Sequence, residues 1–293
     1  MWRFALRESG RFALGLFGAL LLAAMISALA DAGSGAAGFV VRTAERLLDF
    51  VRLDFGSSAI SGASAAQELA ARAPMTLTLL SLGALIAILF GVPLGVVLGT
   101  GPLRRAAAPV IQIVSAAPVF VAGLALAFAA KHLLGWPPSD GAFPQASALL
   151  HGDAEAFRMA LLPALTVGFA AMAAIQVVLR RAAADVQDAP FRAGLKRLGL
   201  STSEIDRAYV TPLLFSGLLA GLGEVMLALL SAAVVAEWVF KTPGMADLFV
   251  TSVALHDWNL VALILFFFAS TALTVNFIGQ LAAHAVTQTG RGS

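Results

Sequence analysis

The sequence predicts an all-α polytopic membrane protein with six transmembrane helices, and three observations support this prediction. Hydrophobic residues make up 59% of the 293 residues and charged residues only 12%, with a mean hydropathy of +0.89. A soluble domain of this length would leave much of that apolar surface in water. Six apolar runs each exceed the roughly 18 residues of a membrane span, and one polar segment, residues 180–212, interrupts them.

The six runs give the spans of a single transmembrane domain that covers residues 1–293. Backbone groups in lipid must hydrogen-bond within their own segment, so each run is expected to be helical. The expected spans are residues 12–30, 75–99, 106–130, 159–179, 208–236 and 258–283. The first run, with arginines before it and Ala28-Leu29-Ala30 at its end, also fits a cleavable signal peptide.

The distribution of Lys and Arg predicts which side of the membrane each loop faces. With six spans, the termini and the loops after spans two and four share one side, which holds twelve of the nineteen Lys and Arg residues. Because basic loops stay in the cytoplasm, both termini and residues 180–212 are expected there. On the outer side, residues 43–55 carry apolar side chains at helical spacing, which predicts an amphipathic helix at the membrane surface.

The sequence contains none of the common catalytic or metal-binding motifs. It has no cysteine, no HExxH and no GxSxG, and the absence of any Gly-Lys pair excludes a phosphate-binding loop of the Walker type. The four histidines are scattered without metal-ligand spacing. We therefore expect no catalytic, cofactor-binding or metal-binding residue here, and the net charge of +2 does not indicate nucleic-acid binding.

Three polar residues inside the spans are candidates for a solute pathway, since polar groups are costly in lipid. Glu224 lies in the fifth run and shares a helical face with small residues such as Gly217 and Gly221. We expect this face to point inward, with Glu224 either a pathway or gating carboxylate or a hydrogen-bonded packing residue. Asn276 and Gln280 in the sixth run either line the pathway or form hydrogen bonds between helices.

Residues 190–209, which we call the elbow, carry the signals of two short helices joined at a glycine. The first helix has a basic face and ends at Gly199, a C′ glycine. Ser201 or Ser203 then caps the second helix, with Glu204 in its first turn, where the helix dipole favours an acid. We interpret the elbow as a docking element, and a basic loop held by anionic lipid headgroups is the alternative.

Motifs along the chain resemble those of one known family. In order, they are LDFGS at residues 53–57, APMTL at 73–77, GVPLG at 91–95, APVF at 117–120, LPALT at 162–166, GLS at 199–201, YVTP at 209–212 and EWVF with PG at 237–244. Together they resemble the permease subunits of bacterial ATP-binding-cassette (ABC) importers, in particular the dipeptide, oligopeptide and nickel branch. The shared cytoplasmic EAA loop of that family begins Glu-Ala-Ala, where this chain has Ala193-Gly194-Leu195.

The resemblance implies a type I importer permease that forms half of a translocation pathway in the bacterial inner membrane. The elbow would then be the coupling helix between spans four and five. The implied partners are a second homologous permease, expected to be a different chain, two cytoplasmic ATPase subunits that hold ATP and Mg, and a periplasmic or lipid-anchored solute-binding protein. The chain itself would bind no cofactor and would not be an enzyme.

The expected site residues fall into three groups. Those expected to couple to the ATPases are Arg192, Lys196, Gly199, Leu200, Ser201, Glu204 and Tyr209. Those expected on the pathway are Glu224, Asn276 and Gln280. Those expected to make contacts on the outer face are Glu237, Phe240, Pro243 and Gly244.

The resemblance makes a peptide or peptide-like compound the expected solute, with nickel, an opine and an oligosaccharide left open. The outer segment at residues 31–41 is shorter than is usual in this branch. Two other classes of function fit the sequence. One is an ion-coupled secondary transporter with Glu224 as its ion site, and the other is a membrane scaffold that recruits a cytoplasmic partner through the elbow.

Overall fold

The computed structural model describes residues 2–29, 35–100, 118–133, 154–187 and 190–289, together with residues 109 and 135. Within this part of the chain every regular element is a helix, so the all-α polytopic prediction is confirmed. The elements are α1 (Trp2–Ala28), α2 (Gly35–Val51), α3 (Ala65–Ile86), η2 (Ala87–Gly91), α4 (Val92–Thr100), α6 (Val119–Leu133), α8 (Ala154–Gln187), α9 (Pro190–Arg197), α10 (Thr202–Ile205), η3 (Asp206–Val210), α11 (Thr211–Ala220), α12 (Leu222–Val239), α13 (Met245–Ala254) and α14 (Trp258–Thr289).

Five stretches of the described helices are long and apolar enough to cross a membrane. They are Trp2–Ala28, Ala65–Val97, Met159–Ala184, Leu222–Val239 and Trp258–Thr287. The third expected span is represented by α6, because most of residues 106–117 lie outside the described part of the chain.

Two helices begin earlier than the apolar runs suggest. α1 begins at Trp2 rather than at residue 12, and α3 begins at Ala65 rather than at residue 75. The apolar runs stop at charged residues, whereas the helices continue through them. In α3 this is possible because Arg72 forms an ion pair with Asp247 of α13 at 4.0 Å.

The fifth expected span is not one continuous helix. It breaks at Gly221, whose φ of −92° and ψ of 3° separate α11 from α12. α14 covers the break, because the Gln280 side chain donates a hydrogen bond to the Ala220 carbonyl oxygen at 3.0 Å. Gly279 lies against the Leu219 carbonyl, so close that an added Cβ would stand 2.3 Å from that oxygen.

α8 is the central helix of the structure. In the part of α8 that could span a membrane, 56% of the residues are buried, more than in any other candidate span. Small residues allow helix backbones to approach closely, and glycines of several surrounding elements meet α8 side chains: Gly83 of α3, Gly91 of η2, Gly95 of α4, Gly123 of α6, Gly217 of α11 and Gly221. Most of the main hydrophobic core lies along this helix.

The chain changes pitch where α3 passes through the π-helical turn η2 into α4. Such turns leave a backbone group without its usual partner, and here the Gln176 side chain of α8 donates to the Gly91 carbonyl oxygen at 2.7 Å. Pro93, which lacks a backbone N–H, follows directly. The GVPLG motif is therefore a docking point for α8.

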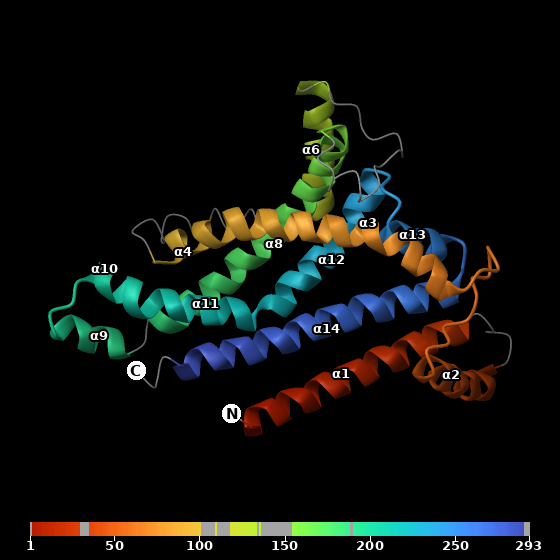
Figure 1. The fold of residues 1–293 in the computed structure, drawn as a ribbon, viewed down its shortest axis with the longest axis horizontal. Coiled ribbons are helices and arrows are strands. Elements are labelled where there is room, and N and C mark those ends of the chain that lie inside the picture. Colours follow the sequence, from red (N-terminus) through yellow and green to blue (C-terminus); the bar gives the residue numbers. More distant parts are fainter. Residues whose placement is uncertain are drawn as a thin grey trace.

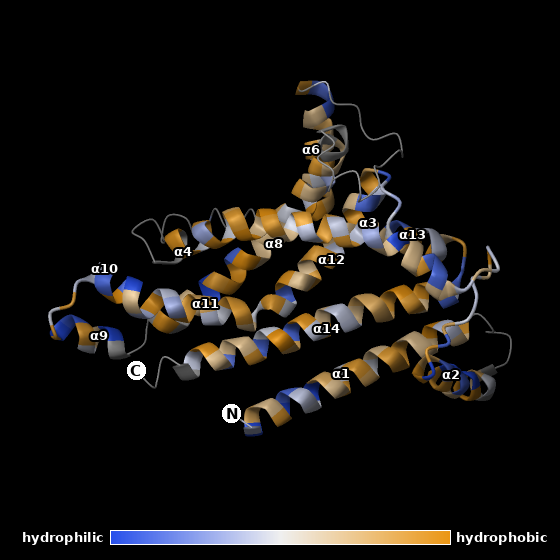
Figure 2. Cartoon of the chain, in the orientation of Figure 1, coloured by the Kyte–Doolittle hydropathy of each residue, from blue (hydrophilic) through white to orange (hydrophobic). Residues whose placement is uncertain are grey.

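The start of α1, the end of α14 and the elbow lie at one end of the molecule (Figure 1). The amphipathic helix α2 and the short helix α13 lie at the opposite end. Figure 2 shows hydrophilic residues concentrated on α9, α10 and α2, whereas the long helices between them are mainly hydrophobic. The structure therefore has two polar ends and an apolar middle.

The contact between Gly279 and the Leu219 carbonyl gives a first prediction. Gly279→Ala should lower the free energy of unfolding by about 1–3 kcal/mol, because the methyl group forces α14 away from the helix break. The measurement is the thermal unfolding midpoint of the purified protein in detergent. Gly18→Ala is the matched control, since Gly18 of α1 has no neighbour within 4 Å of an added Cβ. Equal midpoints for the two variants would contradict the assigned role of Gly279.

Candidate functional site

The elbow begins with α9, which ends in a left-handed glycine. Gly199 has a φ of +91°, a conformation that strains any residue with a side chain. The Leu200 N–H donates to the Leu195 carbonyl at 3.3 Å and the Gly199 N–H donates to that of Lys196 at 3.1 Å. This pair of bonds is a Schellman motif, so Gly199 is the C′ glycine that the sequence indicates.

The second half of the elbow is fixed by a capping box. The Ser201 hydroxyl accepts a hydrogen bond from the Glu204 N–H at 3.3 Å, and the Glu204 carboxylate accepts one from the Ser201 N–H at 2.8 Å. Ser201 is therefore the cap, rather than Ser203. Hydrogen bonds from the side chain and then the backbone of Ser201 lower the pKa of Glu204 below its usual value, so the box is intact at neutral pH.

A largely buried ion pair ties the two halves of the elbow together. Arg192 of α9 lies 2.8 Å from Asp206 of η3, and their side chains are only 11% and 15% exposed. Ile205, Val210 and Leu214 nearby are fully buried in the main core. The described part of the elbow is thus a folded extension of the bundle, and not a loose basic loop.

The exposed surface of the elbow combines basic, apolar and polar side chains. Leu198 is the most prominent, with 79% of its surface exposed, and Lys196, Arg197 and Tyr209 are also exposed. Leu198 and Tyr209 are large apolar side chains that the elbow exposes. Leu198 was missed in the sequence because it reads as part of the helix that precedes Gly199.

The seven residues expected to couple to the ATPases thus divide by position. Lys196 and Tyr209 are exposed, whereas Arg192 and Leu200 face inward, where they hold the elbow to the core. Gly199, Ser201 and Glu204 are exposed and set the backbone of the turn.

A second exposed surface runs along α8 and α12, and we call it the α8/α12 face. It includes a groove of about 250 Å³ lined by Val119, Phe169, Ala170, Ala173, Ala174, Val177, Ala228 and Ser231. Beyond the groove, toward the elbow, the Arg181 guanidinium donates from Nη1 to both carboxylate oxygens of Glu224 at 2.8 and 3.0 Å. The side chains of this pair are 65% and 56% exposed.

The expectation that Glu224 shares an inward face with Gly217 and Gly221 is wrong. Both glycines pack against α8, near Ala182 and Val178, whereas Glu224 is exposed. The reason is the break at Gly221, which resets the helical phase, so that Glu224 falls in the first turn of α12. Arg181 is likewise helical, because α8 continues to Gln187 and includes residues expected in the polar loop.

Asn276 and Gln280 do not join Glu224 on the α8/α12 face. They line a separate cavity of about 150 Å³ between α1 and α14, together with Glu8 and Arg11. Gln280 donates to the carbonyl at the end of α11, as described above. For Gln280 the structure therefore supports hydrogen bonding between helices rather than a place on the pathway.

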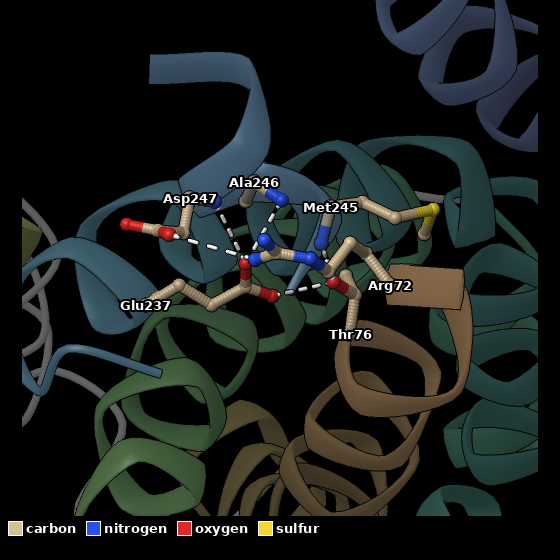
Figure 3. Close-up of polar contacts among 6 residues, drawn as sticks. All are labelled: Arg72, Thr76, Glu237, Met245, Ala246 and Asp247. Atoms are coloured by element: carbon tan, nitrogen blue, oxygen red, sulfur yellow. Dashed lines mark hydrogen bonds and ion pairs between the residues drawn. The ribbon is translucent and has the colours of Figure 1, made fainter. Parts of the chain in front are cut away.

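The outer end of α12 carries a fully buried carboxylate, Glu237. One oxygen accepts a hydrogen bond from the Thr76 hydroxyl at 2.6 Å, and the other accepts from the backbone N–H groups of Ala246 and Asp247 at 2.8 and 2.9 Å (Figure 3). Thr76 in turn accepts from the Met245 N–H at 2.7 Å. Glu237 thus caps the start of α13, where the helix dipole favours an acid, and ties α13 to α3.

This cap corrects the expected outer-face contacts. Glu237 and Phe240 are buried and Gly244 is enclosed, because an added Cβ on Gly244 would stand 2.4 Å from the Glu237 carboxylate. Only Pro243 is exposed. The motif EWVF with PG is therefore an internal joint of α12, α13 and α3, and Thr76 is the partner that sequence spacing did not reveal.

A second buried carboxylate, Asp257, organises the loop before α3 in the same way. It accepts hydrogen bonds from the Ser58 hydroxyl at 2.6 Å and the Ala59 N–H at 2.9 Å, and it caps the start of α14 through the Leu260 N–H at 3.3 Å. The adjoining Asn259 side chain donates to the Ser57 carbonyl at 3.0 Å. The loop that carries LDFGS is thereby fastened to α14.

The described part of the chain contains no group of three or more His, Asp or Glu side chains that could hold a metal ion. The described arrangement is a helical bundle with a capped elbow at one end and two capped joints at the other.

Comparison with known proteins identifies the family. Residues 87–289, from η2 to the end of α14, match the model of the binding-protein-dependent transport system inner membrane component family. The chain belongs to this family and is a membrane-spanning permease component of an ABC importer, as the motifs predict. Importers of this class operate with ATPase and solute-binding partners, and the related chains are transport components rather than enzymes.

Curated relatives agree with the family match. The chain is 26% identical over 238 residues to the glutathione transport system permease protein GsiC of Escherichia coli K12, covering 78% of this chain and 72% of that protein. The protein of the same name from Salmonella typhi is 25% identical over 234 residues, covering 77% and 71%.

The Glu237 joint gives a second prediction. Thr76→Val should lower the free energy of unfolding by about 1–3 kcal/mol, since it leaves a Glu237 oxygen and the Met245 N–H without partners in a buried site. Thr76→Ser keeps the hydroxyl and should lose much less. Chemical denaturation of the purified protein measures both, and an equal loss in the two variants would show that the hydroxyl is unimportant.

Proposed function

We propose that this chain forms one half of the translocation pathway of a peptide-type ABC importer and that its elbow docks on a cytoplasmic ATPase subunit. The observation that carries the proposal is the construction of the elbow. It is a short unit with a capped turn that continues through η3 into α11, and it presents Leu198 to the outside. A partner that moves the elbow therefore acts on α11 without a break in the helical backbone.

The second permease is proposed to lie opposite the α8/α12 face, across the translocation pathway. The exposed sides of α3, η2 and α4 carry large apolar residues, such as Leu85, Ile88 and Phe90, which suit lipid. The α8/α12 face differs, since it has small residues and the Arg181–Glu224 pair. Charged side chains that face lipid are costly, so those within membrane spans almost always face protein or a water-filled cavity. This face is therefore better matched to a protein partner and to a water-filled pathway.

The solute is proposed to be a peptide or a peptide-like compound, delivered to the outer end by a solute-binding protein. Support comes from the two related permeases of glutathione transport systems, because glutathione is itself a small peptide. The partner permease is proposed to be a different chain. The outer end offers preformed surfaces, since Asp257 and Glu237 hold the Ser58 loop and α13 in place.

An ion-coupled mechanism with Glu224 as the ion site is disfavoured by the Arg181 guanidinium. It already occupies both carboxylate oxygens, where a transported cation would bind. A scaffold without transport is disfavoured by the family to which the chain belongs.

The docking role of the elbow gives a third prediction. Leu198→Glu should reduce recovery of the ATPase subunits with the membrane complex by about tenfold, since a charge at the centre of an apolar contact typically costs over 1.4 kcal/mol. Because Leu198 is exposed, the substitution should leave the fold of this chain intact, and its thermal unfolding midpoint checks that.

Leu48→Glu is the matched control for Leu198→Glu. Leu48 is also an exposed leucine on a helix, but it lies on α2 at the opposite end of the molecule. It should leave ATPase recovery unchanged. Normal recovery with Leu198→Glu would contradict docking through the elbow.

The proposed orientation in the membrane gives a fourth prediction. The chain has no cysteine, so a single introduced cysteine reports its own position. In intact spheroplasts a membrane-impermeant maleimide should label Ile60→Cys, in the exposed loop before α3, and should not label Trp2→Cys at the start of α1. Lysis should make Trp2→Cys reactive. Labelling of Trp2→Cys before lysis would place the N-terminus outside.

A further inference from the structure

Arg181 and Glu224 form an ion pair on the α8/α12 face. Arg181 lies near the inner end of the membrane-spanning part of α8, and Glu224 lies in the first turn of α12. α11 separates Glu224 from the elbow, and its ten residues span about 15 Å. The pair therefore lies apart from the elbow, at the inner end of the α8/α12 face.

The position of the pair beside the groove determines what a passing solute meets. The groove is lined by small or apolar side chains, among them Ala174, Ala228 and Ser231. A solute that follows the groove inward next reaches a guanidinium and a carboxylate held together. Both are more than half exposed, so both remain within reach of a solute.

The positive charge of Arg181 and the negative charge of Glu224 cancel each other. A lone carboxylate in a narrow, poorly hydrated passage repels anions and retains cations, and a lone guanidinium does the opposite. The pair presents both signs side by side without a net charge. A zwitterion, which has its own ammonium and carboxylate groups, therefore meets a polar surface that neither repels nor traps it.

The Arg181–Glu224 ion pair can also exchange partners readily. Exposed ion pairs are individually weak because water competes for both groups. The Arg192–Asp206 pair, by contrast, is largely buried in the elbow and is suited to a permanent structural role. The two pairs differ in burial, and only Arg181–Glu224 is open to a solute.

We propose that Arg181 and Glu224 together set the charge selectivity of the inner end of the pathway, and that they suit solutes with balanced charges, such as zwitterionic peptides. This inference rests on the proposed function, because it requires the α8/α12 face to line the pathway. Neither residue is catalytic, and each acts through the field that it creates or cancels.

The test measures the local potential with a reporter cysteine and needs no knowledge of the solute. Ala228→Cys lines the groove one helical turn from Glu224 in a chain that has no other cysteine. In inside-out vesicles that contain the assembled importer, the reporter is modified by two methanethiosulfonates of similar size, one with a sulfonate group and one with a trimethylammonium group. The ratio of their reaction rates on this chain reports the sign of the potential.

With the native pair the ratio should match that of the two reagents on a small free thiol within about twofold. Arg181→Gln should favour the cationic reagent by about tenfold, because Glu224 is then unbalanced, and Glu224→Gln should favour the anionic reagent by about as much. The double variant should restore the native ratio. Leu14→Cys, an exposed α1 residue among apolar neighbours, is the control that should react with neither reagent.

Two results would overturn the proposal. One is no reaction at Ala228→Cys, which would mean that a partner or lipid covers the groove, and the other is the same ratio in both single variants. The proposed function is tested separately by vanadate trapping of the ATPases, which should slow the reaction from the cytoplasmic side. An unchanged rate with the expected charge preferences would overturn the pathway role, while the pair would still control the local field.

Discussion

Close packing against α8 is the constraint on which the rest of the structure depends. Glycines from the helices around it remove the side chains that would otherwise hold those helices away. The same helix runs on toward the elbow, borders the groove and carries Arg181. A displacement of the elbow is therefore transmitted through a helix whose neighbours leave little room for independent movement, since packed interiors have few voids.

Most of the elbow could be predicted from the sequence, because its determinants are local. Gly199 must adopt a positive φ at a helix end, and Ser201 with Glu204 forms a capping box over three residues. Such signals act through neighbouring backbone groups and need no knowledge of the fold. The pairing of Arg192 with Asp206 could not be predicted from the sequence, because it depends on how α9 folds back on η3.

The helix limits and the pathway residues were less predictable, because distant segments decide them. The apolar run at residues 208–236 gives no sign that Gly221 breaks the helix, since the break depends on α14, where Gln280 satisfies the freed carbonyl. Once the helical phase changes there, a periodicity carried across the break assigns Glu224 to the wrong face. The role of Thr76 likewise could not be predicted from its neighbours, because its partner, the Glu237 carboxylate, lies 161 positions away in the sequence.

The Glu237 cap also limits how the outer turn can vary among transporters of this kind. The carboxylate at the end of α12 closes a ring through the backbone of Ala246 and Asp247. The carboxylate reaches these N–H groups only while the turn between α12 and α13 returns the start of α13 to the end of α12. The length of this turn is thus fixed by an internal bond, so insertions that adapt the outer face to new partners are better accommodated in other loops.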